Sequence, residues 1–342
     1  MAATDPPLPG RRPARHWPFV VTLVLGIAIV AAPFMFQMFS RAPKGGEMIN
    51  QFRPYMNRAK IGGFQRDMAE IDRAATEARE EIPGRLGLTP AEVEAEYPTY
   101  ADFDHRWPAI NADMTDMLGT MRTDIPKFEA VDALPPFPLF PWFFVIPGVL
   151  IAAASAWGLL RNRTGRTGFP AAVVVGILGL GLIAAPAIFQ MFTRAPLGGE
   201  MINDFKPLMT RARVERIQGY FLVIGGGEGV LRTAVVPAVD ASVGTAASFP
   251  AVTRFSADFP SISNRMAPMI GAMSDNVGNY DAVKALPPFP LFPWFFVVPG
   301  VLVAEFALVA ARRTTTHPTV RTATTSDAVA VDPIPSPSGG TS

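Results

Sequence analysis

The chain has 342 residues, of which 49% are hydrophobic and only 17% are charged, and its formal net charge is +1. A soluble globular protein carries about 25% charged residues, so this composition favours an integral membrane protein. Cysteine is absent, which excludes disulfides, thiolate metal sites and a cysteine nucleophile. The many Ala, Arg, Pro and Gly residues are typical of a GC-rich bacterial genome.

Both ends of the chain are predicted to be disordered. Residues 1–16 are rich in Pro and Arg and show no apolar periodicity. Residues 312–342 are rich in Thr, Ser and Pro, from which no core can be built, so they are interpreted as a disordered tail.

The first predicted membrane span is a nearly uncharged apolar run at residues 19–39, long enough to cross a bilayer. A basic flank before an apolar run also describes a cleaved signal peptide. The apolar run at 169–192 has the same sequence context, yet it lies mid-chain and cannot be an N-terminal signal. Both runs are therefore predicted to be retained spans, each kinked by a proline near its outer end.

An internal repeat organises the whole sequence. The stretch LPPFPLFPWFFV, followed one residue later by PGVL, occurs at 134–150 and again at 286–302. Its prolines and phenylalanines recur every third residue, which is the period of a polyproline II helix. Its last aromatic residues predict the level at which the chain enters the bilayer. The predicted membrane-interface anchors are Trp142, Phe143, Trp294 and Phe295.

Two further spans are predicted at 141–160 and 293–311, which makes four in all. Arginines cluster before the first span, in the loop 161–168 and after the last span. The positive-inside rule then places both termini in the cytoplasm and the segments 40–139 and 193–291 outside the cell membrane. The basic residues that depart from this rule, at the outer edge of the spans, are Arg41, Lys44 and Arg194.

Each outer segment is predicted to begin with a helix break, because R-A-P-x-G-G-E-M-I-N places Pro and paired Gly before Glu47 and Glu200. In the first segment, apolar residues then recur at alternating steps of three and four over 61–82. Charged residues fill most positions between them, so this stretch is predicted to be an amphipathic helix. A Pro-Gly pair is expected to end it, and Thr89 to begin the next helix.

A second apolar seam follows with the same spacing in both outer segments. Two seamed helices joined by a turn form an αα-hairpin, and two hairpins pack as a four-helix bundle. The predicted fold is thus an all-α integral membrane protein with four transmembrane helices from a tandem duplication and two extracytoplasmic helical-hairpin domains. No structure is predicted for 220–252, where the copies differ. The predicted outer-domain seam comprises Trp107, Met114, Met117, Met121, Phe259, Met266, Met269 and Met273.

Small residues four positions apart also line the predicted spans. This spacing lets two helix backbones approach closely, so it is expected to mark packing faces. The pairs are Gly148 with Ala152, Gly300 with Ala304, and Gly181 with Ala185.

Three patterns suggest chemistry, and each has a simpler interpretation. The methionine triplets offer thioethers to Cu(I), but Met also fills helix seams and no paired His accompanies it. Glycine-rich 223–230 lacks the last Gly of a dinucleotide loop and the GK[ST] of a phosphate loop, so a flexible break is expected. The acidic run around His105 matches no calcium loop. We predict no catalytic residue, metal or cofactor, and expect a protein that is not an enzyme.

Glu305 is the one acidic residue inside a predicted span, and its counterpart in the repeat is Ala153. A carboxylate at mid-membrane costs about 2.5–3.5 kcal/mol on insertion scales, so it marks function by default. Arg312 lies two turns further along the same helix. The alternative is therefore that Glu305 only snorkels or pairs with an arginine.

Two functions fit these features. The first is a non-enzymatic multi-pass membrane protein whose outer domains bind a partner or envelope component, as a scaffold, accessory subunit or sensor. The second is a small transporter or lipid-handling protein with a path between the halves. A transporter should carry polar groups at mid-membrane in both halves, but only Glu305 meets this requirement. The sequence therefore favours the first function. The expected partners are the lipid bilayer, a membrane or envelope protein and a second copy of the chain, with no nucleic acid.

Overall fold

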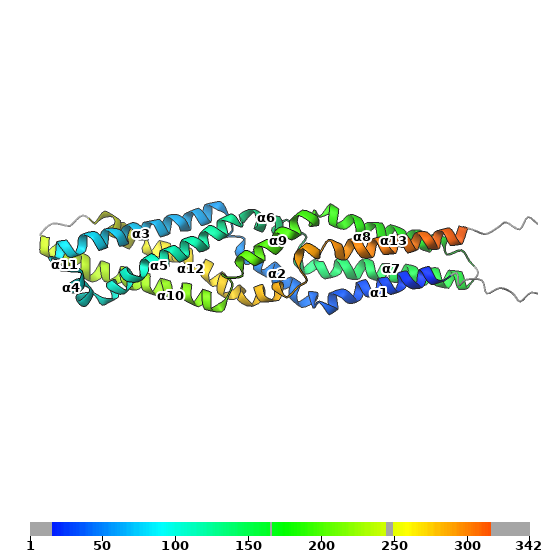
Figure 1. The fold of residues 1–342 in the computed structure, drawn as a ribbon, viewed down its shortest axis with the longest axis horizontal. Helices are drawn as coiled ribbons and strands as arrows, with labels where there is room; N and C mark the ends of the chain where they lie inside the picture. Colours follow the sequence, from blue (N-terminus) through cyan, green and yellow to red (C-terminus); the bar gives the residue numbers. More distant parts are fainter. Residues whose placement is uncertain (1–15, 165, 244–248, 316–342) are drawn as a thin grey trace, which may run out of the picture.

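A computed structural model describes residues 16–164, 166–243 and 249–315. Over these residues the chain forms helices only, arranged as one long rod (Figure 1). Disorder was predicted for 1–16 and 312–342; residues 1–15 and 316–342 lie outside the described residues, whereas 312–315 belong to the last helix, so the prediction is wrong there. One end of the rod, the apolar bundle, consists of α1 (Trp17–Met35), α7 (Phe140–Arg163), α8 (Phe169–Ile188) and α13 (Trp294–Thr315).

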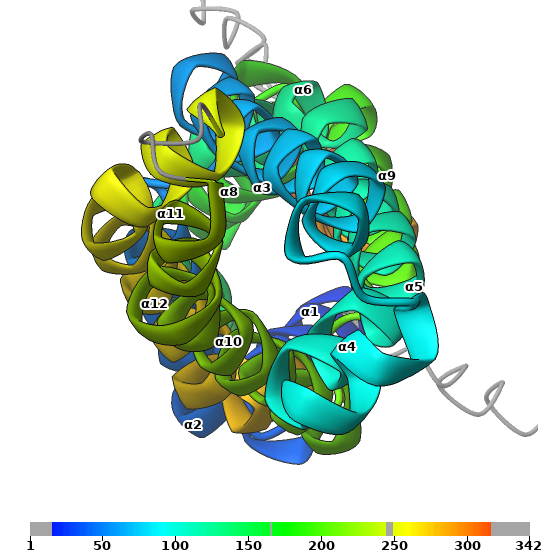
Figure 2. The ribbon, with the colours of Figure 1, turned by 90° about the vertical axis from the view of Figure 1, so that its left-hand side faces the viewer.

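The other half of the rod, the distal bundle, is built mainly from the four helices α3, α5, α10 and α12. They form a ring in which α3 contacts α5, α5 contacts α10, α10 contacts α12, and α12 contacts α3 (Figure 2). Their buried residues form one continuous core. The predicted helix start at Thr89 is confirmed, because Thr89 and Glu92 form a reciprocal capping box. The elements are α3 (Arg58–Leu86), α4 (Pro90–Glu96), α5 (Pro98–Thr123), α6 (Ile125–Asp132), α10 (Arg211–Val230), the π-helical turn η2 (Leu231–Val235), α11 (Val236–Val243) and α12 (Pro250–Lys284).

Five helices of the described residues are long and apolar enough to cross a membrane. Four form the apolar bundle, and the fifth, residues 211–241, lies in the distal bundle. Large side chains on the outside of the apolar bundle, such as Ile177 and Leu180, are exposed although they are apolar. Helices that are apolar on their inner and outer faces alike are typical of membrane spans. The chain is therefore an all-α membrane protein.

The first helix of each half ends before the end of its predicted span. Gln37 and Gln190 follow α1 and α8, and both adopt the left-handed conformation with φ of 53°. This conformation is uncommon outside glycine, so its presence at matching positions marks a turn that both copies require. The kink expected near the outer end of the span is thus a full helix break. The next helices begin at once as α2 (Met38–Phe52) and α9 (Met191–Phe205).

The helix break predicted near Glu47 and Glu200 is wrong, because α2 and α9 run through both residues. The paired glycines allow close packing instead. A Cβ atom on Gly45 would lie 3.1 Å from the Phe137 ring, which is tighter than an ordinary contact. The glycines therefore let the proline-rich segment lie directly on the helix.

The proline-rich segments contain short 3-10 turns where a polyproline II helix was predicted. Both conformations have three residues per turn, so a three-residue period does not distinguish them. The turns lead directly into the last apolar helix of each half. They are η1 (Phe137–Leu139) and η3 (Phe289–Leu291).

The glycine-rich stretch 223–230, expected to be a flexible break, lies wholly within the continuous helix α10. Its glycines accept large rings from neighbouring helices. A Cβ atom on Gly227 would lie 2.4 Å from the Phe103 ring, and one on Gly225 would lie 3.4 Å from Phe259. The missing side chains are therefore a packing feature of the helix.

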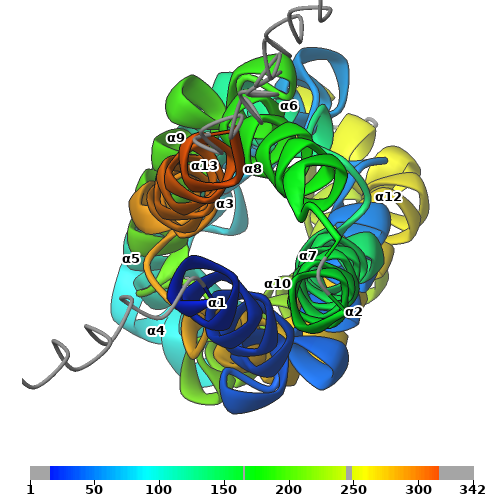
Figure 3. The same cartoon turned by 90° about the vertical axis from the view of Figure 1, so that its right-hand side faces the viewer.

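The two halves of the repeat cross over between the bundles. α2 from the first half lies along α12 from the second, and α9 from the second half lies along α6 from the first. In the apolar bundle, by contrast, α1 pairs with α7 and α8 pairs with α13 (Figure 3). Each half is thus paired within itself at one end of the rod and interleaved with the other half along the rest.

Candidate functional site

Within each half, the two apolar helices are in backbone contact. A Cβ atom on Gly26 would lie 2.8 Å from the backbone nitrogen of Ala152, and one on Gly148 would lie 2.9 Å from the carbonyl oxygen of Gly26. The second half repeats this arrangement, because a Cβ atom on Gly300 would lie 2.9 Å from the carbonyl oxygen of Gly179. The predicted packing faces at Gly148 and Gly300 are confirmed.

Between the halves, the apolar bundle has two looser seams, α1 with α13 and α7 with α8. Near the chain ends the first seam is closed, since the ring of Trp17 lies edge-on at 5.6 Å from that of Phe306. Towards the distal bundle each seam opens into an apolar cleft. The cleft between α1 and α13 measures about 160 Å³, and the one between α7 and α8 about 300 Å³.

The two clefts are built from the same positions of the repeat. Ala28 and Gly181 occupy matching places, and both are exposed at the cleft surface. Nothing lies within 4 Å of a Cβ atom built on Gly181, so the packing face predicted at Gly181 and Ala185 is wrong. Other matching pairs that line the clefts are Leu25 with Leu178, Ala32 with Ala185, Phe36 with Phe189, Phe295 with Phe143, and Pro299 with Pro147.

A stack of phenylalanine pairs separates the clefts along the centre of the rod. The pair Phe144 and Phe296 lies closest, with ring centroids 4.4 Å apart. The next pair, Phe140 and Phe292, follows at 6.0 Å. Each pair joins matching residues of the two halves, so the stack lies where the halves meet.

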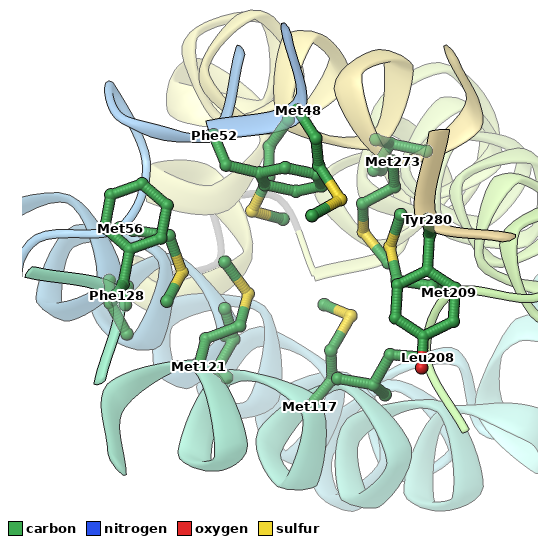
Figure 4. Packing of buried hydrophobic residues seen from close by; sticks show 14 of the residues in the cluster. Met48, Phe52, Met56, Met117, Met121, Phe128, Leu208, Met209, Met273 and Tyr280 are labelled. Atoms are coloured by element: carbon green, nitrogen blue, oxygen red, sulfur yellow. The ribbon is translucent and has the colours of Figure 1, made fainter. Parts of the chain in front are cut away.

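Beyond the stack, the core of the distal bundle is rich in methionine. Figure 4 shows Met48, Met117, Met209 and Met273 directed towards one another, three from the helices α2, α5 and α12 and Met209 from the turn between α9 and α10. A small apolar cavity of about 30 Å³ lies among Met48, Met209 and their neighbours. Flexible thioether side chains fill such irregular spaces well. Of the predicted seam, Trp107, Met114, Met117, Met121, Met266, Met269 and Met273 are buried, and Phe259 is half-buried.

The predicted membrane anchors divide into two kinds. Trp142 and Trp294 are about half exposed, and each meets a phenylalanine edge-on, at 5.5 Å and 5.8 Å between ring centroids. Phe143 and Phe295 instead turn inwards and line the two clefts. Glu305 is exposed on the outside of α13, and it lines neither cleft.

An ionic cluster joins the halves in the distal bundle. Lys127 on α6 lies 2.9 Å from an oxygen of buried Asp124 and also pairs with Asp204 on α9. Burial raises the pKa of Asp124, although the ion pair with Lys127 opposes this shift. The hydrogen bonds that Lys127 donates to Asp204 and Asp124 raise the pKa of its ammonium.

The matching place at the other crossing carries neutral amides. Asn276 on α12 donates to the side-chain oxygen of Gln51 on α2 at 2.5 Å, and Asn279 donates to Asn276 at 3.0 Å. In the repeat these three residues replace the members of the ionic cluster. The same junction between the halves is therefore made with charges on one side of the rod and without them on the other.

The described residues hold no group of three or more His, Asp or Glu side chains placed to bind a metal. In the acidic run of the sequence, His105 lies 3.5 Å from Glu94, and both side chains are mostly exposed. No protein-family model matches the chain, and no curated protein matches it either. The argument for function therefore rests on the site itself.

Proposed function

We propose that this protein handles lipids, admitting acyl chains from the bilayer into the clefts between its two halves. The observation that supports the proposal is the pair of apolar clefts, built at matching positions of the repeat and open on the side of the apolar bundle. In a bilayer, an apolar recess on the side of a bundle is filled by hydrocarbon, since water gains no hydrogen bonds there.

The linings of the clefts continue inwards without polar residues. Met38 and Met191 each line one cleft and also the space around the phenylalanine stack. A path for ions or polar solutes requires polar groups along it, whereas this lining suits a hydrocarbon chain. The larger cleft reaches the lower end of the range of about 300–1,000 Å³ that ligand pockets occupy. We propose that the protein is not an enzyme and binds no cofactor.

The proposal includes a topology of four spans with both termini in the cytoplasm of a bacterial cell. The start of α1 at Trp17 and the end of α13 at Thr315 lie at the same end of the rod (Figure 1). The fifth apolar segment, 211–241, packs among charged helices, and Arg213 at its start pairs with Asp113 at 2.7 Å. We therefore place it outside with the rest of the distal bundle.

Reporter fusions test this topology. Fusions after Arg163 and after Arg313 should report the cytoplasm, and a fusion within 90–100 should report the exterior. A fusion after residue 243 should also report the exterior, because both ends of 211–241 then lie on the same side. A cytoplasmic signal from the fusion within 90–100 would overturn the proposed orientation.

Filling the clefts tests the function. Gly181→Leu combined with Ala28→Leu places side chains into both clefts, and space for the first is free in the structure. We expect the purified wild-type protein to retain two phospholipids in native mass spectrometry and the double variant to retain none. Gly219→Leu, at another glycine with free space but in the distal bundle, is the matched control. Equal lipid retention by the double variant and the control would contradict the proposal.

A second function, the binding of a partner protein by the outer region, is supported by a separate observation. A groove of about 530 Å³ runs beside the proline-rich segment of the first half. Its lining combines charged residues, among them Glu47 and Arg53, with the rigid surface of Pro135 and Pro136. A photo-crosslinking residue at Asn50 in this groove should trap a defined envelope or membrane protein in cells. No specific crosslink there, with lipid binding intact, leaves lipid handling as the function.

A further inference from the structure

An arginine from each half stands at the junction of the two bundles, next to the mouth of a cleft. Arg41 donates through Nη1 to the carbonyl oxygens of Phe36, at 3.3 Å, and Ala285, at 2.9 Å. Phe36 lines the cleft between α1 and α13. Arg194, the matching residue, donates through Nη1 to the carbonyl oxygen of Ala133 at 2.8 Å. Each arginine thereby joins one half of the repeat to the other.

Both arginines lie one helical turn from the cleft lining. Met38 lines the first cleft three residues before Arg41, and Met191 lines the second three residues before Arg194. Residues three apart are neighbours on one face of a helix. The guanidinium groups are therefore placed where the apolar cleft gives way to the level of the lipid headgroups.

Among the described residues, no carboxylate lies within ion-pair distance of Arg41 or Arg194, although both side chains are half-buried. Towards the described residues each guanidinium group donates hydrogen bonds through Nη1 only, so donors on Nε and Nη2 remain for another acceptor. These arginines are also, with Lys44, the basic residues that depart from the positive-inside rule. A bound anion would explain a positive charge at this level in both halves.

We propose that each cleft and its arginine form one binding site for an anionic phospholipid of the leaflet next to the distal bundle. The acyl chain occupies the cleft, and the phosphate accepts hydrogen bonds from the guanidinium, which binds phosphate strongly because of its planar array of donors. This inference rests on the proposed lipid-handling function and adds the class of lipid. Lys44 adds a second cation near the first site only, because Leu197 replaces it in the second half.

Lipid selectivity tests the inference. The full-length protein is reconstituted in nanodiscs of equimolar phosphatidylglycerol and phosphatidylcholine, and the lipids retained after extraction are identified by native mass spectrometry. We expect two retained lipids, enriched at least threefold in phosphatidylglycerol. Arg41→Gln with Arg194→Gln should still retain two lipids, since the clefts are intact, but at the ratio of the nanodisc. Arg106→Gln, in an exposed ion pair of the distal bundle, should keep the enrichment.

Two further variants separate the charge from the carbonyl contacts. Arg41→Lys with Arg194→Lys keeps the positive charge, so it should retain an enrichment above that of the Gln variant. Loss of enrichment in the Lys and Gln variants alike would show that the contacts with Ala285 and Ala133 matter and the charge does not, which overturns the inference. Enrichment that persists in the Gln variant would also overturn it while leaving the function intact. A wild-type protein that retains no lipid would instead reject the lipid-handling function itself.

Discussion

The two bundles join the halves of the repeat in opposite ways. In the apolar bundle, backbone contact occurs within each half, at Gly26 and Gly148, while the seams between the halves open into clefts. Along the rest of the rod the halves interlock, with α2 along α12 and α6 along α9, and polar side chains such as Lys127 bridge the crossing. The strong connection between the halves therefore lies outside the apolar bundle.

This contrast has a physical cause and a consequence. In water, burial of apolar surface drives the halves together, whereas lipid chains are as apolar as the helix surfaces and drive no such association. Gly and Ala allow close contact between the backbones of apolar helices, and such contact occurs within each half. Because the rest of the rod keeps the halves together, the seams of the apolar bundle can stay open without loss of the fold, as the proposed lipid binding requires.

The largest expected effect concerns the core of the distal bundle. Trp107 is buried and donates through its indole nitrogen to Asp72 at 2.9 Å. Trp107→Ala should lower the free energy of unfolding by about 3–5 kcal/mol, as for other buried aromatic residues. Phe259, its counterpart, is half-buried and lies against Gly225 without a hydrogen bond, so Phe259→Ala should cost less. Denaturation followed by circular dichroism measures both losses of stability. Equal losses would show that the difference in burial between Trp107 and Phe259 has no effect on stability.

The next prediction compares the two kinds of contact in the apolar bundle. Gly148→Leu forces a side chain against the backbone of α1 and should destabilise the protein by about 3 kcal/mol or more, since overpacking cannot relax there. Gly181→Leu enters a cleft and should leave the unfolding midpoint in detergent within a few degrees of wild type. If both variants are equally destabilised, the clefts are not open in the folded protein.

A smaller effect is expected where charged and neutral versions of one junction are compared. Lys127→Met leaves buried Asp124 without its cation and should cost about 2–3 kcal/mol at neutral pH, below the roughly 3–5 kcal/mol of a fully buried pair. Asn279→Met, at the matching place, removes one neutral hydrogen bond and should cost about 1 kcal/mol.

The pH dependence of the Lys127→Met variant has a defined sign. Burial already raises the pKa of Asp124, and without the cation that pKa should rise further. A carboxyl group whose pKa is higher in the folded than in the unfolded state contributes stability at low pH that is lost as pH rises through the folded pKa. The difference from wild type should therefore shrink as pH falls towards about 4, the usual pKa of aspartic acid. A deficit that does not change with pH would contradict the assignment.

The smallest effect is expected at Glu305. The side chain lies on the outside of α13, away from both clefts, and Ala153 occupies the matching place in the first half. Glu305→Gln should therefore leave lipid retention, protein level and growth unchanged. A growth defect at normal protein level would show that this carboxylate functions, and it would favour the transporter alternative.

Much of the local structure follows from the sequence alone. The helices and the apolar face of each are predicted by the apolar runs, the repeated sequence segments and the apolar residues spaced three and four apart. Trp107 and the methionine triplets are buried, as this spacing indicates. The helix start at Thr89 is likewise predicted by local chemistry. These features depend on neighbours within one helical turn, which the sequence specifies directly.

Only the tertiary structure decides which helices are neighbours. The small-residue motif of Gly148 is in backbone contact, whereas the similar motif of Gly181 lines an open cleft. The helix breaks at Gln37 and not at Pro43 and the paired glycines, where the sequence predicted the break. Two copies of one sequence offer each apolar face a partner in its own half and an equivalent partner in the other. Periodicity shows that a face must be covered, but packing of the whole rod determines which copy covers it.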